Sequence, residues 1–191
     1  LWYDAENING VQNSGLSGSI GEWKDLSGNG YHLTESSNKP TLIDSGGKPY
    51  LSFDGSNDRL SVDLSGNILD NPSNQNMTVF TVVKPIGGYY IISSGGQTSS
   101  DFGYALSYQA GSSFSSIRVS NGNGGSGGGP EVTISSEFTA GNIHLVTDVF
   151  KGDVNNWTTQ VNAKKFNVAT NGLGPYSSNG NGINLFTVGR P

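Results

Sequence analysis

The sequence predicts an all-β fold in which two antiparallel sheets pack face to face as a sandwich. Two stretches, residues 22–33 and 51–62, each place apolar side chains at strand spacing around a tight turn of Asp, Asn, Gly and Ser. The composition points the same way, because 29 of the 191 residues are Gly and only 13% are charged, which is typical of short strands joined by many turns. A chain of this length can bury one substantial core, so we expect a single domain over residues 1–191.

The first half of the chain is expected to alternate short strands with polar turns. Residues 1–5 predict an opening strand, and the polar, glycine-rich stretch that follows, up to Gly21, predicts a long loop. Trp23 begins the first corner and is expected in the core, because a buried Trp commonly anchors sandwiches. Further strands are predicted over residues 40–43, 50–53 and 59–62, the first two joined by a turn at Gly46-Gly47.

The second half is richer in apolar runs. Residues 77–84 are nearly continuous in apolar and β-branched residues, which predicts a central strand buried on both faces. A three-stranded meander, a flexible loop, a hairpin and a last strand are expected to follow. The predicted ranges are 89–94, 103–109 and 115–120 for the meander, 121–130 for the loop, 132–134 and 143–150 for the next strands, 157–161 for the return arm of the hairpin, and 183–188 for the last strand.

Two motifs carry a resemblance to a known family. They are W-x-D-x-S-G-N-G-x-x-L from Trp23 to Leu33 and L-x-F-D-G-S-N-D-x-L-x-V from Leu51 to Val62. Together with the later strands, they make the chain similar to laminin-G-like or concanavalin-A-like jelly-roll domains over nearly its whole length. The resemblance implies a jelly-roll sandwich, a fold that serves lectins, glycan-binding modules, adhesins, phage fibres and some glycosidases, so it indicates the fold better than the function.

The resemblance also implies one strand more than the chain shows. Family members usually follow the last strand with another that carries a G-x-I-x-E-x-x-x-Y-like pattern, whereas the sequence stops at Pro191. The final strand is therefore expected either in residues beyond Pro191 or from a neighbouring chain, and the 191 residues alone are expected to self-associate or to be marginally stable.

Charge and composition narrow the classes of partner. The net charge is −5 and the ten Lys and Arg residues are scattered, which argues against nucleic acid and favours a neutral or cationic partner. No apolar run approaches the roughly 20 residues that span a membrane. The chain has no cysteine, so the fold is expected to depend on packing, with or without a bound cation.

Catalytic patterns are weak in this sequence. Hydrolysis by a Ser-His-Asp unit needs a histidine beside a serine, and the only histidines, His32 and His144, are expected to be structural. Glycosidases of this fold usually place two carboxylates on one strand, in a pattern such as E-x-D-x-x-E. Glu22 and Asp25 instead run into a turn, and Asp148 stands alone on its strand, so we predict that the protein is not an enzyme.

Oxygen ligands gather in the two corners. Calcium takes about six to eight oxygens from carboxylates, amides and backbone carbonyls, and several could come from the corners if these meet in space. The candidate metal ligands are Asp25, Asn29, Asp54, Asn57 and Asp58. The alternative is that Asp25 and Asp54 accept hydrogen bonds from backbone N–H groups of their own turns.

Tyrosines cluster in the predicted meander, where aromatic rings could stack on sugar faces. The candidate ligand-binding residues are Tyr89, Tyr90, Tyr104 and Tyr108. Tyr104 and Tyr108 share one face of their strand, and Tyr89 and Tyr90 point to opposite faces. The alternative is that they are ordinary half-buried tyrosines of a sheet.

These observations lead to two hypotheses. The first is a non-catalytic carbohydrate-binding, lectin-like or adhesive module of an extracellular, cell-surface or virion-surface protein. The second is a structural or decoration module of a viral particle or surface appendage, which contacts neighbouring subunits and binds no sugar. An exposed tyrosine in a groove would favour the first, whereas a broad apolar patch or an unpaired edge strand would favour the second.

Overall fold

The computed structural model describes residues 1–64, 76–86, 90–95, 102–108, 115–119, 131–134, 137–151, 158–167 and 185–189. All regular secondary structure in these ranges is β-strand, and every strand pair is antiparallel. The prediction of an all-β antiparallel fold is therefore confirmed for this part of the chain.

The described strands form three sheets. The largest has eight strands in the order β11 (Glu131–Thr133), β10 (Ser115–Val119), β9 (Phe102–Tyr108), β8 (Tyr90–Gly95), β15 (Leu185–Gly189), β6 (Arg59–Asp63), β3 (Leu33–Thr34) and β2 (Glu22–Trp23). A second sheet has the order β14 (Lys164–Asn167), β13 (Thr158–Val161), β12 (His144–Lys151) and β7 (Asn76–Val83). A small third sheet contains β1 (Gly18–Ser19), β4 (Thr41–Asp44) and β5 (Pro49–Ser52).

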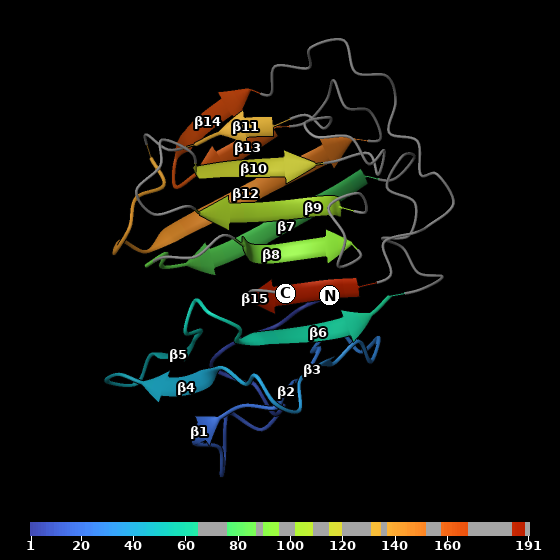
Figure 1. Cartoon of the computed structure of the whole chain (residues 1–191), viewed down its shortest axis with the longest axis vertical. Helices are drawn as coiled ribbons and strands as arrows, with labels where there is room; N and C mark the ends of the chain where they lie inside the picture. Colours follow the sequence, from blue (N-terminus) through green and yellow to red (C-terminus); the bar gives the residue numbers. More distant parts are fainter. Residues whose placement is uncertain are drawn as a thin grey trace.

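The two larger sheets pack on each other and give the molecule its sandwich character. In Figure 1, β8, β9 and β10 lie in front of β7, β12 and β13. The core cluster joins Ile92 and Leu106 of the eight-stranded sheet to Val146 and Val161 of the four-stranded sheet. Ile134 and Phe138, from the chain between β11 and β12, complete this cluster. Burial of these apolar side chains between the sheets is the main stabilising contribution.

Most predicted strands are confirmed within the described ranges. β4 and β5 pair around Gly46 and Gly47, both of which have a positive φ that glycine adopts without strain. β8, β9 and β10 form the expected antiparallel meander. Tyr89 and the loop at 121–130 lie outside the described residues.

The N-terminal prediction was wrong in one respect. Residues 1–5 do not form a strand. Their polar groups bond instead to the first corner: the N–H of Trp2 donates to Asp25 Oδ1 at 2.9 Å, and the N–H of Leu26 donates to the Trp2 carbonyl at 2.8 Å. Trp23 is half-buried rather than fully buried, and the Tyr3 ring of this segment packs against it at 5.8 Å between centroids.

The prediction for residues 77–84 was also wrong. β7 is not a central strand buried on both faces: it is at the end of its sheet, and Phe80 and Val82 are exposed. Thr81 is buried and Val79 and Val83 pack against the core, so only one face of the strand is covered. A continuous apolar run fits a strand with two apolar faces, and the sequence alone does not say whether the second face is covered.

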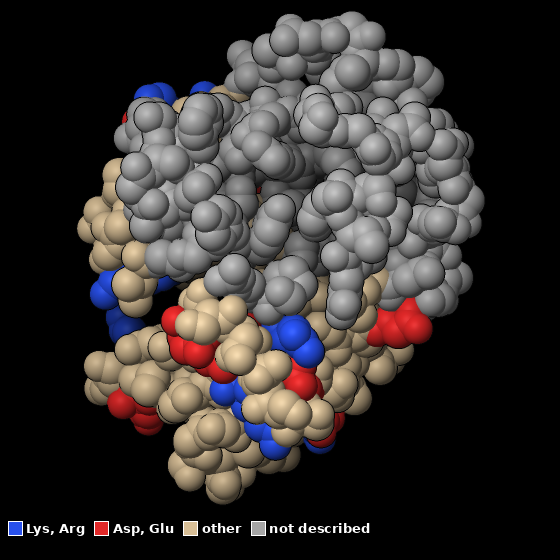
Figure 2. Space-filling model, viewed as in Figure 1, with Lys and Arg blue, Asp and Glu red and all other residues tan. Residues whose placement is uncertain are grey.

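On the face shown in Figure 2, most of the visible described acidic and basic side chains are intermingled in the lower half of the molecule, and a few lie at its upper left. Arg59 and Glu35 form an ion pair in which the Nε and Oε2 atoms are 2.8 Å apart. Backbone N–H groups of Ser37 and Ser36 also donate to this carboxylate, and together with Arg59 they hold the pKa of Glu35 below its usual value although partial burial acts against them.

Candidate functional site

The first corner is closed by Asp25, two residues after the end of β2. Gly28 and Gly30 have φ values of 85° and 79°, which lets the chain reverse between β2 and β3. Asp25 is only 5% exposed, and its carboxylate accepts four hydrogen bonds. The donors are Trp2 N–H at 2.9 Å, Ser27 N–H at 3.0 Å, Ser27 Oγ–H at 2.7 Å and Tyr31 N–H at 3.3 Å.

These contacts set the charge state of the corner. Burial acts to raise the pKa of Asp25, but the hydrogen bonds from Trp2, Ser27 and Tyr31 outweigh it and hold the pKa below its usual value. Tyr3 lies nearby and donates from its hydroxyl to the Tyr31 carbonyl at 2.6 Å. Burial, and then the negative charge of Asp25, raises the pKa of Tyr3. The corner therefore contains a fixed carboxylate and a neutral phenol at neutral pH.

The second corner has the same residue types, but the N–H groups bonded to its Asp54 carboxylate lie within its own turn. Asp54 Oδ1 accepts hydrogen bonds from the N–H groups of Ser56, Asn57 and Asp58, at 2.8, 3.1 and 3.2 Å. Asp58 Oδ2 in turn accepts from the Asp54 N–H at 3.0 Å. These N–H donors lower the pKa of Asp54, which is at the surface. This turn is closed by its own side chains.

The contacts of both aspartates match the alternative to calcium, in which each carboxylate caps its own turn. Asn29 likewise bonds within its turn, through Nδ2 to Ser27 Oγ at 2.8 Å. Within the described ranges, no group of three or more His, Cys, Asp or Glu side chains is placed to hold a metal ion. Calcium ligation by Asp25, Asn29, Asp54, Asn57 and Asp58 stays a prediction.

Three of the four candidate tyrosines lie on neighbouring strands of the meander. Tyr90 is opposite Ser107, the residue before Tyr108, and Tyr104 is further along β9, opposite Val119. The adjacent pair, Ile92 and Leu106, is buried in the core. Alternation along β9 puts positions 104 and 108 on the face that Leu106 shares and position 107 on the outer face. Position 90 pairs with Ser107 across a bulge between Tyr90 and Ile92, so it belongs to the outer face as well.

The residues considered for catalysis have structural contacts. His32 Nδ1 accepts from the Asp25 N–H at 3.0 Å. His144 is buried against the Phe138 ring, and its Nε2 lies 2.9 Å from the Thr139 carbonyl oxygen. Asp148 is fully buried and accepts from Thr159 Oγ1 at 2.6 Å. None of these contacts brings a histidine to a serine hydroxyl among the residues described.

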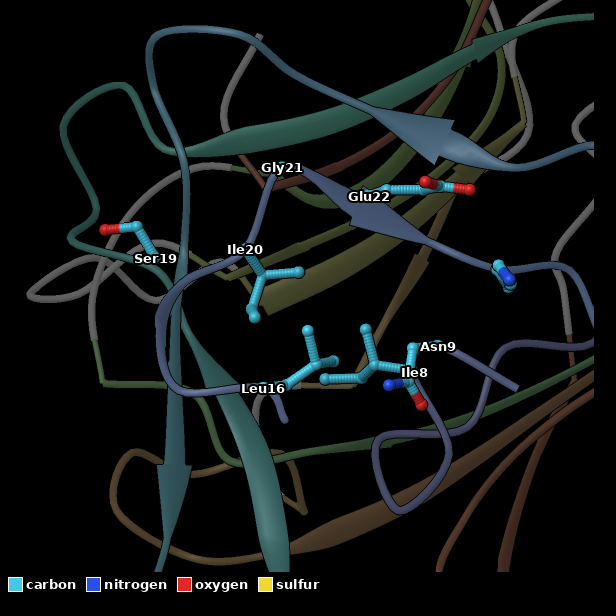
Figure 3. Close-up of a pocket in the computed structure, with 8 residues that line it drawn as sticks. Ile8, Asn9, Leu16, Ser19, Ile20, Gly21 and Glu22 are labelled. Atoms are coloured by element: carbon cyan, nitrogen blue, oxygen red, sulfur yellow. The ribbon is translucent and has the colours of Figure 1, made fainter. Parts of the chain in front are cut away.

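A pocket that the sequence did not predict lies beside the N-terminal loop. It has a volume of about 140 Å³. Figure 3 shows the side chains of Ile8, Leu16 and Ile20 converging on it, and Asn9, Glu22 and Lys24 also line it. The apolar residues Ile8 and Ile20 are themselves buried.

The loop beside this pocket is shaped by asparagine side chains. Asn13 Oδ1 accepts from the Ile8 N–H at 2.6 Å, and Asn7 Oδ1 accepts from the Gln12 N–H at 2.7 Å. Gln12 and Asn13 both have positive φ values, 55° and 59°. The repeated Asn residues at 7, 9 and 13 were the available signal, but the partners of Asn7 and Asn13 are five residues away and do not form a short turn motif.

No family model, curated protein or solved structure matches the chain. In the part of the chain that the structure describes, no helix has the length and apolar character needed to cross a membrane.

Proposed function

We propose that this chain is a non-catalytic carbohydrate-binding or adhesive module of an extracellular or surface-displayed protein, built as a jelly roll of the laminin-G-like or concanavalin-A-like type. Two observations support the proposal. The antiparallel sheets share one core, and both corner motifs that carry the resemblance form tight turns closed by an aspartate.

One observation carries the sugar-binding part of the proposal. The register of β8 and β9 places Tyr90 opposite Ser107, one pair beyond the buried pair of Ile92 and Leu106. Ser107 follows the inward-facing Leu106, so position 107 belongs to the outer face, and position 90 pairs with it there. An aromatic residue and a hydroxyl residue therefore occupy neighbouring positions on the outer face. Sugar sites combine an aromatic platform with a few polar groups that fix orientation. Tyr90 is therefore the residue on which we expect a pyranose ring to stack.

A glycan array tests this proposal directly. We expect the 191-residue chain to bind a defined set of glycans, and Tyr90→Ala to weaken binding by about tenfold or more, because a stacking contact is lost. Tyr50→Ala is the matched control: Tyr50 is also a tyrosine of a sheet and is exposed, but it lies on β5 in the small third sheet. Equal binding by both variants, or no glycan bound by the parent chain, would contradict the proposal.

A second candidate function is supported by a different part of the molecule. Exposed apolar residues beside an edge strand favour a structural or decoration module that contacts neighbouring protein subunits and binds no sugar. Phe80, Val82 and Ile143 are such residues, and β7 is at the end of its sheet. A parent protein in which Tyr90→Ala has no effect but Phe80→Ser releases the chain from its assembly would favour this candidate.

A further inference from the structure

Five large apolar side chains lie exposed along β7 and β12. They are Phe80 at 71%, Val82 at 73%, Ile86 at 76%, Ile143 at 72% and Leu145 at 43%. Leu145 is opposite Val82 in the register, so both belong to the outer face of the four-stranded sheet. Ile86 and Ile143 lie just outside these two strands, near the hydrogen bond that the Gly141 N–H donates to the Pro85 carbonyl at 2.8 Å. We name this surface, defined by these five residues, the β7 patch.

The β7 patch is comparable to the largest apolar patch of a typical monomeric protein, and such patches are often functional. For side chains of this size, the exposed fractions correspond to on the order of 500 Å² of apolar surface, in the upper range for the largest patch on a typical monomer. The outer positions further from β7 are polar, such as Gln160 on β13 and Lys165 on β14, which are exposed. The apolar character is therefore confined to the side of the sheet that ends at β7.

β7 is also an unprotected edge. Among the described strands it pairs with β12 alone, through eight consecutive residue pairs without a bulge. Residues 76–83 contain no charged residue and no proline. Natural edge strands are usually blunted by charges, prolines or bulges, and none of these devices is present in β7. Within the described residues no strand pairs with the outer edge of β7, so its N–H and C=O groups are placed to pair with one more strand.

Thr81 adds an independent sign of an absent neighbour. It lies on the inner face of β7 and is only 8% exposed, yet its hydroxyl has no hydrogen-bond partner among the described residues. Buried hydroxyls are nearly always paired, and an orphan one needs an explanation. On an antiparallel neighbour strand, the residue opposite Thr81 would have its Cβ about 5 Å away, within reach of a Thr or Ser hydroxyl contact.

The arrangement of the sheets indicates what kind of neighbour fits. In Figure 1, β8 and β9 lie in front of β7, and the eight-stranded sheet continues past it through β15, β6, β3 and β2. Two copies joined edge to edge through β7 would drive these large sheets into each other. A single strand brings no second sheet with it and avoids this collision.

We propose that the β7 edge accepts one extended strand donated by a neighbouring polypeptide. The donated strand runs antiparallel to β7, carries no charge opposite residues 79–83, has β-branched or aromatic residues opposite Phe80 and Val82, and places Ser or Thr opposite Thr81. This deepens the second candidate function, since it names the kind of contact a subunit would make, and it does not depend on sugar binding.

A synthetic peptide with the sequence of residues 78–84 is a suitable probe. Paired antiparallel and centred on Thr81, it places Thr opposite Thr81, Val opposite Phe80 and Phe opposite Val82, and it brings no second sheet with it. We expect saturable binding of the fluorescently labelled peptide by anisotropy, and slower hydrogen exchange of β7 amides in the complex. The same peptide with Pro in place of the residue opposite Phe80 is the matched control and should not bind, because the N–H of that residue faces β7 and Pro cannot donate to the ladder.

Three variants of the protein sharpen the test. Phe80→Ser changes an exposed residue, so the fold should be retained while peptide affinity falls about tenfold or more. Gln160→Ser, an exposed outer-face change on β13, should leave affinity unchanged. Thr81→Val removes the orphan hydroxyl, so it should raise the melting temperature of the free protein and weaken peptide binding severalfold, a combination that a purely structural role for Thr81 would not give.

Several results would overturn the proposal. They are the absence of saturable binding, equal binding of the proline peptide, and affinity unaffected by Phe80→Ser. Light scattering that shows a dimer of the 191-residue chain, lost in Phe80→Ser, would assign the edge to a second copy instead and would also overturn it. The glycan array tests the first candidate function independently of strand binding, because Phe80→Ser should bind glycans like the parent chain even if it no longer binds the peptide.

Discussion

The first and second corners are both closed by an aspartate that accepts backbone N–H groups, yet Asp25 is buried and Asp54 is at the surface. The difference lies in one donor. Asp54 bonds only to residues two to four positions ahead of it, whereas Asp25 also accepts from the N–H of Trp2, 23 residues away. Asp25 therefore holds the N-terminal segment on the sandwich, whereas Asp54 caps only its own turn.

One turn motif thus has two structural roles in the same molecule. Tyr3 strengthens the role of the first corner, because its ring contacts Trp23 and Phe186 and its hydroxyl bonds to the Tyr31 carbonyl. No local sequence pattern distinguishes the corners in this respect. The two corners differ in the long-range hydrogen bond from the Trp2 N–H, which accompanies the burial of Asp25. Removing a buried, hydrogen-bonded carboxylate costs more stability than removing an exposed one.

The largest expected effect separates the two corners directly. Asp25→Ala leaves four donors without their acceptor in a buried site, so we expect a loss of about 3 to 4 kcal/mol in the free energy of unfolding. Asp54→Ala should cost much less, because its donors are exposed and can bond to water. Urea unfolding at about pH 7 measures both. Equal losses would mean that the N-terminal segment is not held by Asp25.

The next effect concerns the aromatic side of the first corner. Trp23→Ala should cost about 2 to 3 kcal/mol, somewhat below the range for a fully buried Trp, because Trp23 is half-buried. It also removes the hydrogen bond from Trp23 Nε1 to the Asp4 carbonyl at 3.1 Å. Trp2→Ala is the matched control, since the Trp2 side chain is exposed, and it should change stability by less than about 0.5 kcal/mol.

Thermal melts of the two Trp variants check this expectation. Similar melting temperatures for Trp23→Ala and the parent chain would show that the contact between Tyr3 and Trp23 does not hold the N-terminal segment. A double-mutant cycle with Tyr3→Ala isolates that contact, and a coupling energy near zero would contradict the packing described for the first corner.

The elements predicted best from the sequence are those specified by neighbouring residues. Gly46 and Gly47 predicted the turn between β4 and β5, and the apolar pattern of the three following strands predicted the meander. The residues at 1–5 were mispredicted because their hydrogen bonds go to Asp25 and Leu26, which strand periodicity does not reveal. For β7, the apolar run predicted a strand correctly but not which of its faces would be covered.

The candidate sites were predictable to a similar extent. The aspartate turns follow from local Asp, Asn, Gly and Ser residues, and their capping role was one of two alternatives visible in the sequence. The pairing of Tyr90 with Ser107 depends on the β-bulge between Tyr90 and Ile92, where one extra residue shifts the alternation. A bulge of this kind depends on both strands, so one strand's sequence does not predict it.

A smaller effect tests the charge of the first corner. The pKa of Asp25 is lowered in the folded state, so its contribution to stability is present above the unfolded pKa near 3.8 and is lost as the pH falls through the lower folded value. We expect the parent chain to be less stable at about pH 3 than at about pH 6, and Asp25→Asn to narrow that difference. Asp54→Asn should narrow it less, because the carboxylate is exposed and solvent screens it.

Urea unfolding curves of the parent chain and both Asn variants at the two pH values measure this. Asp54→Asn could reduce the difference in unfolding free energy between the two pH values as much as Asp25→Asn does. The loss of stability in acid would then not come from the buried carboxylate. The distinction between the corners would then rest on the neutral contacts of Tyr3 and Trp23 alone.

The smallest expected effect concerns calcium. An ion bound only by the folded protein stabilises it by RT ln(1 + [L]/Kd), about 2.7 kcal/mol at a hundredfold excess over Kd. In both corners, however, the carboxylates already accept N–H groups that compete with a cation for the same oxygens. We therefore expect melts in EDTA and in millimolar calcium to differ by less than about a degree. A clear drop in EDTA that disappears in Asp54→Ala would instead place a calcium ion at the second corner, and the difference between the corners would then be one of ligand as well as of burial.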